Sequence, residues 1–159
     1  MSDYKTFTSE EFRKKLKEFE GCSLKAYRCA AGVWTIGYGH TRDVKRGDRI
    51  TEWYANDLLS DDISIAERQV LRLGVCKTQG QLDALVDFVF NLGIGNLKIS
   101  TLLRYIQEGT HTREEIEHQF MRWVYARGQK LPGLIMRRAW EAKRFFEESE
   151  KLIYDKENY

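Results

Sequence analysis

Apolar residues recur at helical spacing near the start of the chain. Positions three or four residues apart are occupied by Phe12, Leu16 and Phe19. This spacing predicts an amphipathic helix with one side turned toward a core. The residues from Thr8 to Glu11 form a capping box, which predicts where the helix begins. Gly21 predicts where it ends, because glycine readily adopts the left-handed conformation that follows a helix.

Further segments carry the same pattern, each opened by a residue typical of a helix start. Threonine caps and one proline mark these starts. The expected helices begin at Thr51, Thr78, Thr101, Thr112 and Pro132. The helix from Thr51 is long and runs toward Gly74, and the helix from Thr101 stops at Gly109.

Between Ser23 and Thr41 the period of the pattern changes to two, which predicts a strand over residues 33–39. One face of this strand carries Trp34, Ile36 and Tyr38, whereas the other carries Thr35, Gly37 and Gly39. The second face is therefore almost bare. The sequence predicts an α+β fold, mainly α, in one domain over residues 1–159. Its expected parts are a β-lobe near 21–50, a connecting helix near 52–73, and a helical lobe near 78–150 that includes the N-terminal helix.

Length and composition exclude two classes of protein. With 42% hydrophobic and 13% aromatic residues, the 159-residue chain is not an intrinsically disordered protein. Its longest apolar run, from Cys29 to Trp34, is far shorter than the roughly 20 residues that cross a bilayer. The N-terminus has no apolar segment typical of a secretion signal. We therefore expect no stable membrane association.

Charge is nearly balanced, at a formal net value of +2. This balance gives no indication of a nucleic-acid partner, and we expect none. A basic block extends from Phe120 to Arg138, and an acidic block from Glu52 to Glu67. We interpret each block as a solvated helix face, with a nucleic-acid groove as the less favoured alternative for the basic one.

The cysteines and histidines do not indicate a metal site. Cys22, Cys29 and Cys76 fit no zinc spacing, and without a secretion signal we expect free thiols in a reducing cytoplasm. Gly37 and Gly39 lack the third glycine of a dinucleotide-binding loop. The sequence therefore predicts neither a metal nor another cofactor.

Glu20 is the first candidate for chemistry. It lies at the C-terminal end of the predicted first helix, where the helix dipole favours the protonated form of a carboxyl group. A nearby apolar shell would act in the same direction. Such a group suits general acid catalysis near neutral pH, although a solvated terminal glutamate is the simpler alternative.

The spacing around Glu20 favours the catalytic interpretation. Eight residues separate Glu20 from Cys29, and five separate Cys29 from Thr35. This arrangement resembles the phage-type lysozyme (endolysin) family, whose signature is Glu, eight residues, Asp or Cys, five residues and Thr. Other segments resemble the family in the same order, so that the resemblance extends from about residue 8 to 150. They are residues 19–21, 24–27, 32–41, 88–93, 100–103 and 123–138.

The resemblance implies a lysozyme-like fold with the active site in a cleft between two lobes. Glu20 would donate a proton to the leaving oxygen of a glycoside. Cys29 would either position a water molecule or attack as a thiolate, and Thr35 would hold the water. Cys29 replaces the commoner Asp, which leaves the mechanism open, and a small buried hydrophobe is its simpler interpretation. Gly37 and Gly39 would let a sugar ring approach the backbone.

Further residues acquire roles from the same resemblance. The expected substrate-binding residues are Gly37, Gly39, Phe90, Asn91, Trp123 and Arg137. His40 would form a structural ion pair with Asp62. Arg137 is favoured over Arg138 as a partner of Glu20, because Arg138 points about 100° further round the helix.

The implied activity is that of a muramidase, which hydrolyses the β-1,4 bond between N-acetylmuramic acid and N-acetylglucosamine in peptidoglycan. The protein would be a monomeric phage lysis protein made in the host cytoplasm. It would reach the periplasmic peptidoglycan through a holin-type membrane lesion. Two alternatives stay open: a cysteine-dependent amidase or peptidase using Cys29 and His40, and a non-catalytic sugar-binding protein.

Overall fold

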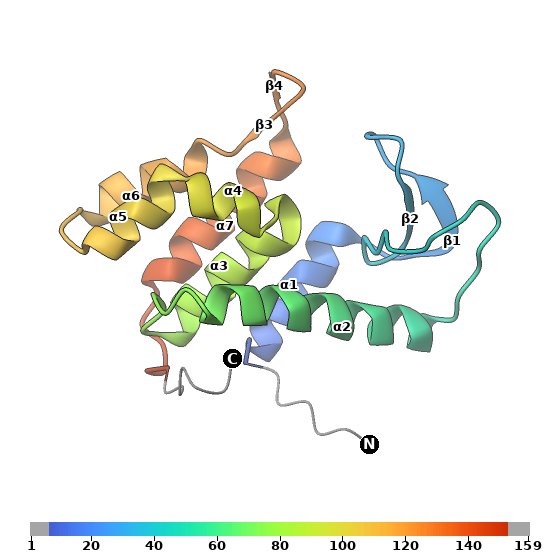
Figure 1. Cartoon of the computed structure of the whole chain (residues 1–159), viewed down its shortest axis with the longest axis horizontal. Helices are drawn as coiled ribbons and strands as arrows, with labels where there is room; N and C mark the ends of the chain where they lie inside the picture. Colours follow the sequence, from blue (N-terminus) through green and yellow to red (C-terminus); the bar gives the residue numbers. More distant parts are fainter. Residues whose placement is uncertain (1–6, 153–159) are drawn as a thin grey trace.

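The computed structural model describes residues 7–152 of the chain. Helices dominate it, and the strands form two separate two-stranded antiparallel sheets (Figure 1). The expected class, mainly α with a small β part, is confirmed. The elements in chain order are α1 (Glu10–Glu20), β1 (Ser23–Arg28), β2 (Trp34–Gly37), α2 (Glu52–Leu71), α3 (Gln79–Leu92), α4 (Ile94–Ile99), α5 (Thr101–Glu108), α6 (Arg113–Met121), β3 (Tyr125–Ala126), β4 (Gln129–Lys130) and α7 (Pro132–Phe146).

Helix α3 lies at the centre of the helical lobe, packed between α2 and α7. Every residue from Leu82 to Val89 is buried, so the helix is enclosed on all sides. Burial of each large apolar side chain contributes about 1.5–3 kcal/mol. Prominent members of the core around α3 are Phe12, Leu16, Leu59, Ile63, Val70, Leu97, Leu102, Phe120 and Phe145.

The β-lobe is a hairpin of β1 and β2, with Tyr27 opposite Thr35 and Ser23 opposite Gly37. The predicted strand over residues 33–39 ends early, at Gly37. The chain then turns back on itself, because Ile36 and His40 exchange two backbone hydrogen bonds of 2.9 Å. This reversal requires the positive φ angles of Gly37 and Gly39, 63° and 78°.

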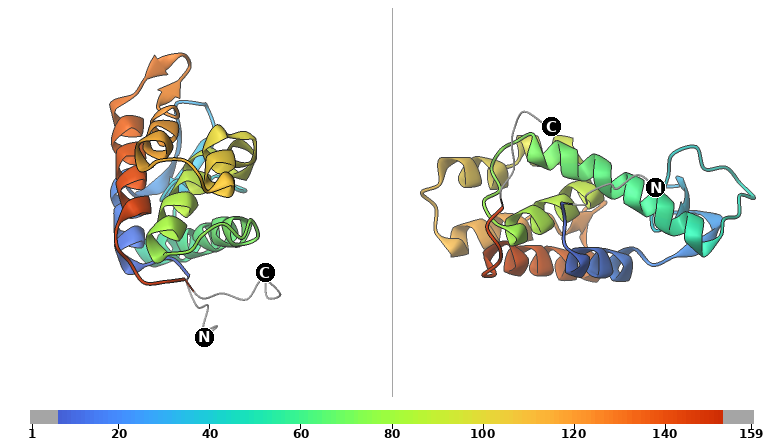
Figure 2. Two further views of the ribbon diagram at one scale, coloured as in Figure 1. Left: turned by 90° about the vertical axis from the view of Figure 1, so that its left-hand side faces the viewer. Right: turned by 90° about the horizontal axis from the view of Figure 1, so that it is seen from below.

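Helix α2 connects the β-lobe to the helical lobe along the length of the molecule (Figure 2). As predicted, Thr51 caps it: the hydroxyl oxygen accepts a hydrogen bond from the Tyr54 backbone N–H at 3.1 Å. The helix ends at Leu71, before Gly74. Its last carbonyls accept the shorter-range hydrogen bonds of a tightened final turn, from Leu73 to Val70 and from Gly74 to Leu71.

The start of α1 differs from the prediction by one residue. Ser9, not Thr8, is the N-cap, and its oxygen accepts the Phe12 N–H at 3.1 Å. The hydroxyl of Thr8 instead donates to the buried Glu67 of α2 at 2.5 Å. The hydroxyl of Ser9 donates to the buried Asp83 of α3, also at 2.5 Å. Both hydroxyls therefore tie α1 to distant helices, which a local pattern does not reveal.

The remaining caps are predicted with mixed success. Thr112 forms the complete capping box of α6 with Glu115. Thr78 forms only half of one, because the Gln81 side chain accepts a bond from the Lys77 N–H and not from Thr78. The starts of α5 and α7 agree with prediction. The short elements α4, β3 and β4 were not predicted, since none is long enough to show a repeating pattern.

The basic block from Phe120 to Arg138 does not lie on one solvated face. Its first cations, among them Arg127 and Lys130, are exposed, but Arg137 and Arg138 are buried in α7. A buried guanidinium requires carboxylate partners. The interpretation as a solvated face is therefore wrong for these two arginines.

Candidate active site

Glu20 is the last residue of α1, and Gly21 ends the helix with a φ of 65°. The Glu20 side chain is only 19% exposed, and its Oε1 accepts a hydrogen bond from Nη1 of Arg137 at 2.6 Å. The expected apolar shell is therefore absent at this oxygen, and the partner of Glu20 is a cation. Arg137, the arginine that the helix geometry favoured, is the one that pairs with it.

Gly39 lies directly against the same carboxyl group. A Cβ atom at this position would be 2.7 Å from Glu20 Oε2 and 3.2 Å from Glu20 Cδ, closer than such atoms approach in proteins. The φ of Gly39, 78°, also disfavours any L side chain. A bare backbone at residue 39 is therefore needed to leave the Glu20 carboxyl group in place.

Gly37, the other glycine expected to contact a sugar, is buried. A Cβ atom there would lie 3.4 Å from Ile50 Cδ1 and 3.5 Å from Ala55 Cβ of α2, which is ordinary van der Waals contact. The φ of 63°, and not a lack of space, is therefore what favours glycine at this position. The burial of Gly37 gives no support to its predicted role in substrate binding.

Asp87 of α3 holds the guanidinium that contacts Glu20. Its two oxygens accept bonds from Nε and Nη2 of Arg137 at 2.8 and 3.0 Å, and the Asp87 side chain is fully buried. Burial alone would lower the pKa of Arg137, but Asp87 and then Glu20 raise it above its ordinary value. Sequence reasoning missed Asp87. The signal for it is an acid within the apolar run from Leu85 to Val89.

A second buried pair lies behind the first. Arg138 and Glu141 are both fully buried, with Nε and Oε2 2.7 Å apart in an ion pair whose angle is poor for a hydrogen bond. Nη2 of Arg138 donates to Oε1 of Glu141 at 2.8 Å. Burial raises the pKa of Glu141 well above its ordinary value, the charge of Arg138 opposes this rise, and Asp87 adds to it. Glu20, Arg137 and Asp87 thus alternate in charge, and Glu141, paired with Arg138, places a second carboxyl group beside Asp87.

Asn91 and Trp123, both expected to bind substrate, have separate partners in the helical lobe. Asn91 Oδ1 accepts a bond from Arg138 Nη2 at 2.7 Å. The Trp123 ring packs edge-on against Phe88, with centroids 5.5 Å apart. Trp123 also borders a separate hollow of about 290 Å³, together with Ser100 and Arg122. Both residues are therefore anchored by the helical lobe.

Cys29 and Thr35 lie together at the end of the β1–β2 hairpin. Cys29 is partly exposed, and its backbone N–H bonds the Val33 carbonyl at 3.0 Å. Hydrogen bonds from the backbone at Val33 and then Ala31 lower the pKa of the Cys29 thiol, and partial burial opposes them. The hydroxyl of Thr35 donates to the Val33 carbonyl at 3.0 Å. The hairpin thus favours a thiolate at residue 29.

The lowered pKa leads to a test by alkylation. In a Cys22→Ser variant, we expect iodoacetamide to modify Cys29 with a rate midpoint below about pH 8.5, the ordinary thiol value. Cys76 should not react, because burial raises its pKa to about 12. Mass spectrometry of tryptic peptides over a pH series measures both rates. A Cys29 midpoint at or above that of a free thiol contradicts the inferred environment.

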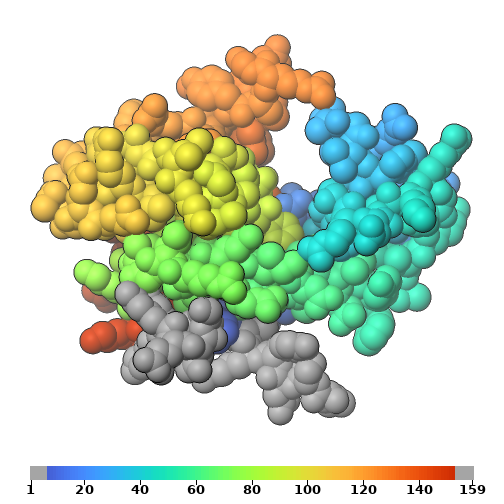
Figure 3. All heavy atoms as spheres, in the orientation of Figure 1, coloured from blue at the N-terminus to red at the C-terminus, as the bar shows by residue number. Residues whose placement is uncertain are grey.

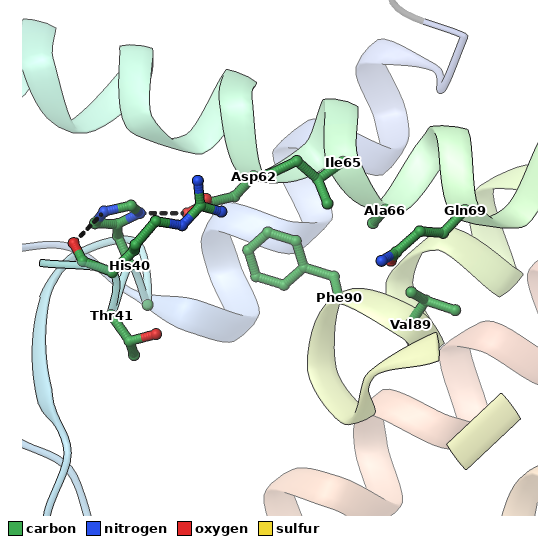
Figure 4. Close-up of a pocket in the computed structure, with 10 residues that line it drawn as sticks. His40, Thr41, Asp62, Ile65, Ala66, Gln69, Val89 and Phe90 are labelled. Atoms are coloured by element: carbon green, nitrogen blue, oxygen red, sulfur yellow. Dashed lines mark hydrogen bonds and ion pairs between the residues drawn. The ribbon is translucent and has the colours of Figure 1, made fainter. Parts of the chain in front are cut away.

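His40 and Asp62 lie on either side of the boundary between the β-lobe and α2. His40 Nδ1 is 2.7 Å from Asp62 Oδ2, and Nε2 is 3.0 Å from the Arg42 carbonyl oxygen (Figure 4). The pair borders a cavity of about 230 Å³ into which the ring of Phe90 points. Gly39 lines this cavity too, and the Glu20 carboxyl group lies directly behind Gly39.

This geometry disfavours the amidase alternative. Both ring nitrogens of His40 have other partners, so neither is available as a base for Cys29. Cys29 lies in a strand turn and not at the start of a helix, where a thiolate nucleophile gains from the helix dipole. Within residues 7–152, no three His, Cys, Asp or Glu side chains are placed to bind a metal ion. No helix of that part of the chain is long and apolar enough to cross a membrane.

Comparison with known proteins agrees with the geometry. The sequence profile of the family described as phage lysozyme matches residues 17–141. The endolysin of Acyrthosiphon pisum secondary endosymbiont phage 1 is 40% identical in an alignment of 142 positions, which covers 86% of this chain and 96% of the relative. The endolysin of Bacillus phage PZA is 41% identical over 82% of this chain, but the chain spans only 51% of that relative.

A solved structure shows the same fold. The muramidase domain of SpmX from Asticaccaulis excentricus superposes with a TM-score of 0.76 at 35% identity, over 88% of this chain and 97% of the domain. The profile match and the endolysin relative each extend over most of the present sequence. The chain therefore belongs to the phage lysozyme family.

Proposed function

We propose that this protein is a phage endolysin with muramidase activity, hydrolysing the β-1,4 bond between N-acetylmuramic acid and N-acetylglucosamine in peptidoglycan. The observation that carries the proposal is the Glu20 carboxyl group, fixed between Gly39 and Arg137 beside the cleft cavity. A relative named endolysin and a structural neighbour named muramidase domain support the same activity.

Hydrolysis of a glycoside needs a proton on the leaving oxygen and a second group at the anomeric carbon. Glu20 supplies the proton. Cys29, whose hairpin favours the thiolate, either accepts a hydrogen bond from the attacking water or attacks the sugar itself. Thr35 donates its hydroxyl proton to the Val33 carbonyl, so the hydroxyl oxygen is left to accept a bond from that water.

The residues around the cleft serve binding and position. Phe90 offers a ring face to a sugar in the cavity, and Gly39 leaves room beside Glu20. Asn91 and Trp123, held by Arg138 and Phe88, lie in the helical lobe and would contact sugars beyond this cavity. The His40–Asp62 pair fastens the β-lobe to α2 and takes no part in proton transfer.

The proposed biological setting is that of a phage lysis protein. The protein is made in the host cytoplasm, reaches the periplasmic peptidoglycan through a holin-type membrane lesion, and acts as a monomer. The relatives' name endolysin supports a role in lysis from within. Expression with and without a holin, followed by culture turbidity, tests the dependence on a membrane lesion.

A single digest tests the reaction. Purified protein is incubated with peptidoglycan sacculi, and the products are analysed for reducing ends, free amino groups and anhydro-muramic ends. We expect new reducing ends only. New amino groups would indicate an amidase or peptidase, anhydro ends a lytic transglycosylase, and unchanged sacculi that still bind the protein a sugar-binding protein.

Substitutions at Cys29 separate its two roles. If it positions water, Cys29→Asp keeps much of the activity, because a carboxylate accepts the same hydrogen bond. Cys29→Ala removes either role and should lower the rate at least ~100-fold, as other single deletions in catalytic sites do. Reducing-end release measures both variants, and mass spectrometry with a slow substrate detects a sugar–sulfur adduct if Cys29 is a nucleophile. Near wild-type turnover of Cys29→Ala would assign the role to another acid, with Asp43 as the next candidate.

A further inference from the structure

The β3–β4 hairpin reaches across the mouth of the cleft. Figure 3 shows a hollow between the helical lobe and the β-lobe, with this hairpin approaching the tip of the β1–β2 hairpin above it. A hydrogen bond joins the two tips: Nη2 of Arg127 donates to the carbonyl oxygen of Ala30 at 2.5 Å, 97 residues away in the sequence. Ala30 belongs to the opposite lobe and directly follows Cys29.

The backbone of Arg127 is strained. Arg127 and Gly128 form the two-residue turn between Ala126 and Gln129, and both have positive φ angles, 51° and 75°. Two positive φ angles are typical of a type I′ turn, for which Asn-Gly is the preferred sequence. A long side chain at the first position costs stability, which suggests that the side chain has a use.

The acceptor lies in the turn that carries Cys29. Within this turn, the Gly32 N–H bonds the Cys29 carbonyl at 2.8 Å, and the Cys29 N–H bonds the Val33 carbonyl at 3.0 Å. These bonds fix the shape of the turn but not its place relative to the helical lobe. A contact from Arg127 to the Ala30 carbonyl supplies that placement.

We propose that Arg127 is a positioning residue for Cys29. Its side chain spans the cleft mouth and holds the Cys29 turn at a fixed distance from the helical lobe. Arg137 of the helical lobe holds Glu20, so the two contacts together fix Cys29 relative to Glu20. The inference rests on the proposed function, because it assigns Arg127 a part in the same reaction. The structural part of the inference does not depend on that function: without the Arg127 guanidinium, the two hairpin tips should separate more often.

Two substitutions that each remove one positive charge from the β3–β4 hairpin test this role, and a third retains the charge. Arg127→Asn creates the preferred Asn-Gly turn, so the hairpin keeps its stability while the side chain becomes too short to reach Ala30. Lys130→Gln removes a positive charge from the same hairpin, where Lys130 lies over the Tyr125 ring and not on the β-lobe. Arg127→Lys retains the charge and most of the reach.

We expect Arg127→Asn to lower kcat about three- to tenfold, the factor that corresponds to one ordinary hydrogen bond. KM for short glycan fragments should stay within about twofold, since the effect lies at the reacting centre and not in binding. Lys130→Gln should retain the wild-type kcat, and Arg127→Lys should recover part of the loss. Thermal unfolding of Arg127→Asn should occur at or above the wild-type Tm.

Amide hydrogen exchange provides a readout that needs no activity. In Arg127→Asn, the amides of Cys29 and Gly32 should exchange faster by the same factor, about three- to tenfold. They should be unchanged in Lys130→Gln. If wild-type protein releases no reducing ends, the proposed function fails while the exchange experiment still decides whether the contact holds the turn.

Three results would overturn the proposal. Equal losses in Arg127→Asn and Lys130→Gln would indicate general attraction to an anionic wall polymer. Unchanged kcat and exchange in Arg127→Asn would show that the contact positions nothing. A rise in KM alone would assign Arg127 to substrate binding.

Discussion

Glu20→Gln is expected to lower the rate of reducing-end release about 100- to 10,000-fold, the usual contribution of a general acid. Glutamine has the shape of glutamate and its amide oxygen still accepts the bond from Arg137 Nη1. It has no carboxyl proton to give to a leaving oxygen. Binding of peptidoglycan should persist, and the loss should appear in kcat.

The variant should fold normally, because the guanidinium of Arg137 retains both of its bonds to Asp87. Glu18→Gln is the matched control, since Glu18 lies on the same helix but is exposed and pairs with the surface residue Lys15. Circular dichroism and thermal unfolding check the fold of both. Turnover of Glu20→Gln above one tenth of wild type would show that another group donates the proton.

The sequence predicted elements whose signals are local. The apolar spacing of Phe12 and Leu16 identified α1, and the threonine caps placed the starts of α2 and α6 correctly. The set Glu20, Cys29 and Thr35 came from the resemblance to the family signature, and the structure places Cys29 and Thr35 in one hairpin. The local pattern did not identify Ser9, rather than Thr8, as the N-cap of α1. Both hydroxyls donate to buried carboxylates of other helices, which a local pattern does not contain.

The contacts that support the site could not be predicted in this way. Asp83 and Asp87 lie one helical turn apart on α3 and face Arg144 and Arg137, which lie two turns apart on α7. Each pair joins residues at least 50 positions apart. A periodic pattern places such residues on a helix, but it does not state which two helices meet.

Gly37 and Gly39 show the same limit at shorter range. Alternation placed both on one bare face of a strand, and both seemed suited to a sugar. Their positive φ angles end the strand instead, so that one glycine packs on α2 and the other on Glu20. Backbone conformation, which the pattern does not contain, separates the two roles.

Asp87→Asn is expected to destabilise the protein by about 3–5 kcal/mol, the usual cost of removing one partner of a buried ion pair. Asp87 is fully buried and the Arg137 side chain is 6% exposed, so solvent does not replace the lost charge. Asparagine keeps one oxygen for Arg137 but leaves the guanidinium with Glu20 as its only ionised partner. Urea unfolding measures the loss.

The same substitution should also lower turnover per folded molecule. Asp87 accepts two of the hydrogen bonds that fix the Arg137 guanidinium, and that guanidinium in turn holds the Glu20 carboxyl group. When one of these bonds is lost, the carboxyl group is held less firmly. We therefore expect kcat to fall about three- to tenfold, the factor that corresponds to one ordinary hydrogen bond.

Asp83→Asn is the control that separates stability from catalysis. Asp83 is equally buried on α3 and holds Arg144 of α7 by bonds of 2.8 and 3.1 Å, at a place where it bonds the start of α1 and not Glu20. It should lose comparable stability and keep the wild-type kcat per folded molecule. If both variants lower kcat alike, or neither does, Asp87 acts only in the fold. A loss of kcat confined to Asp87→Asn would show that a buried carboxylate behind Arg137 holds Glu20 in place for the reaction.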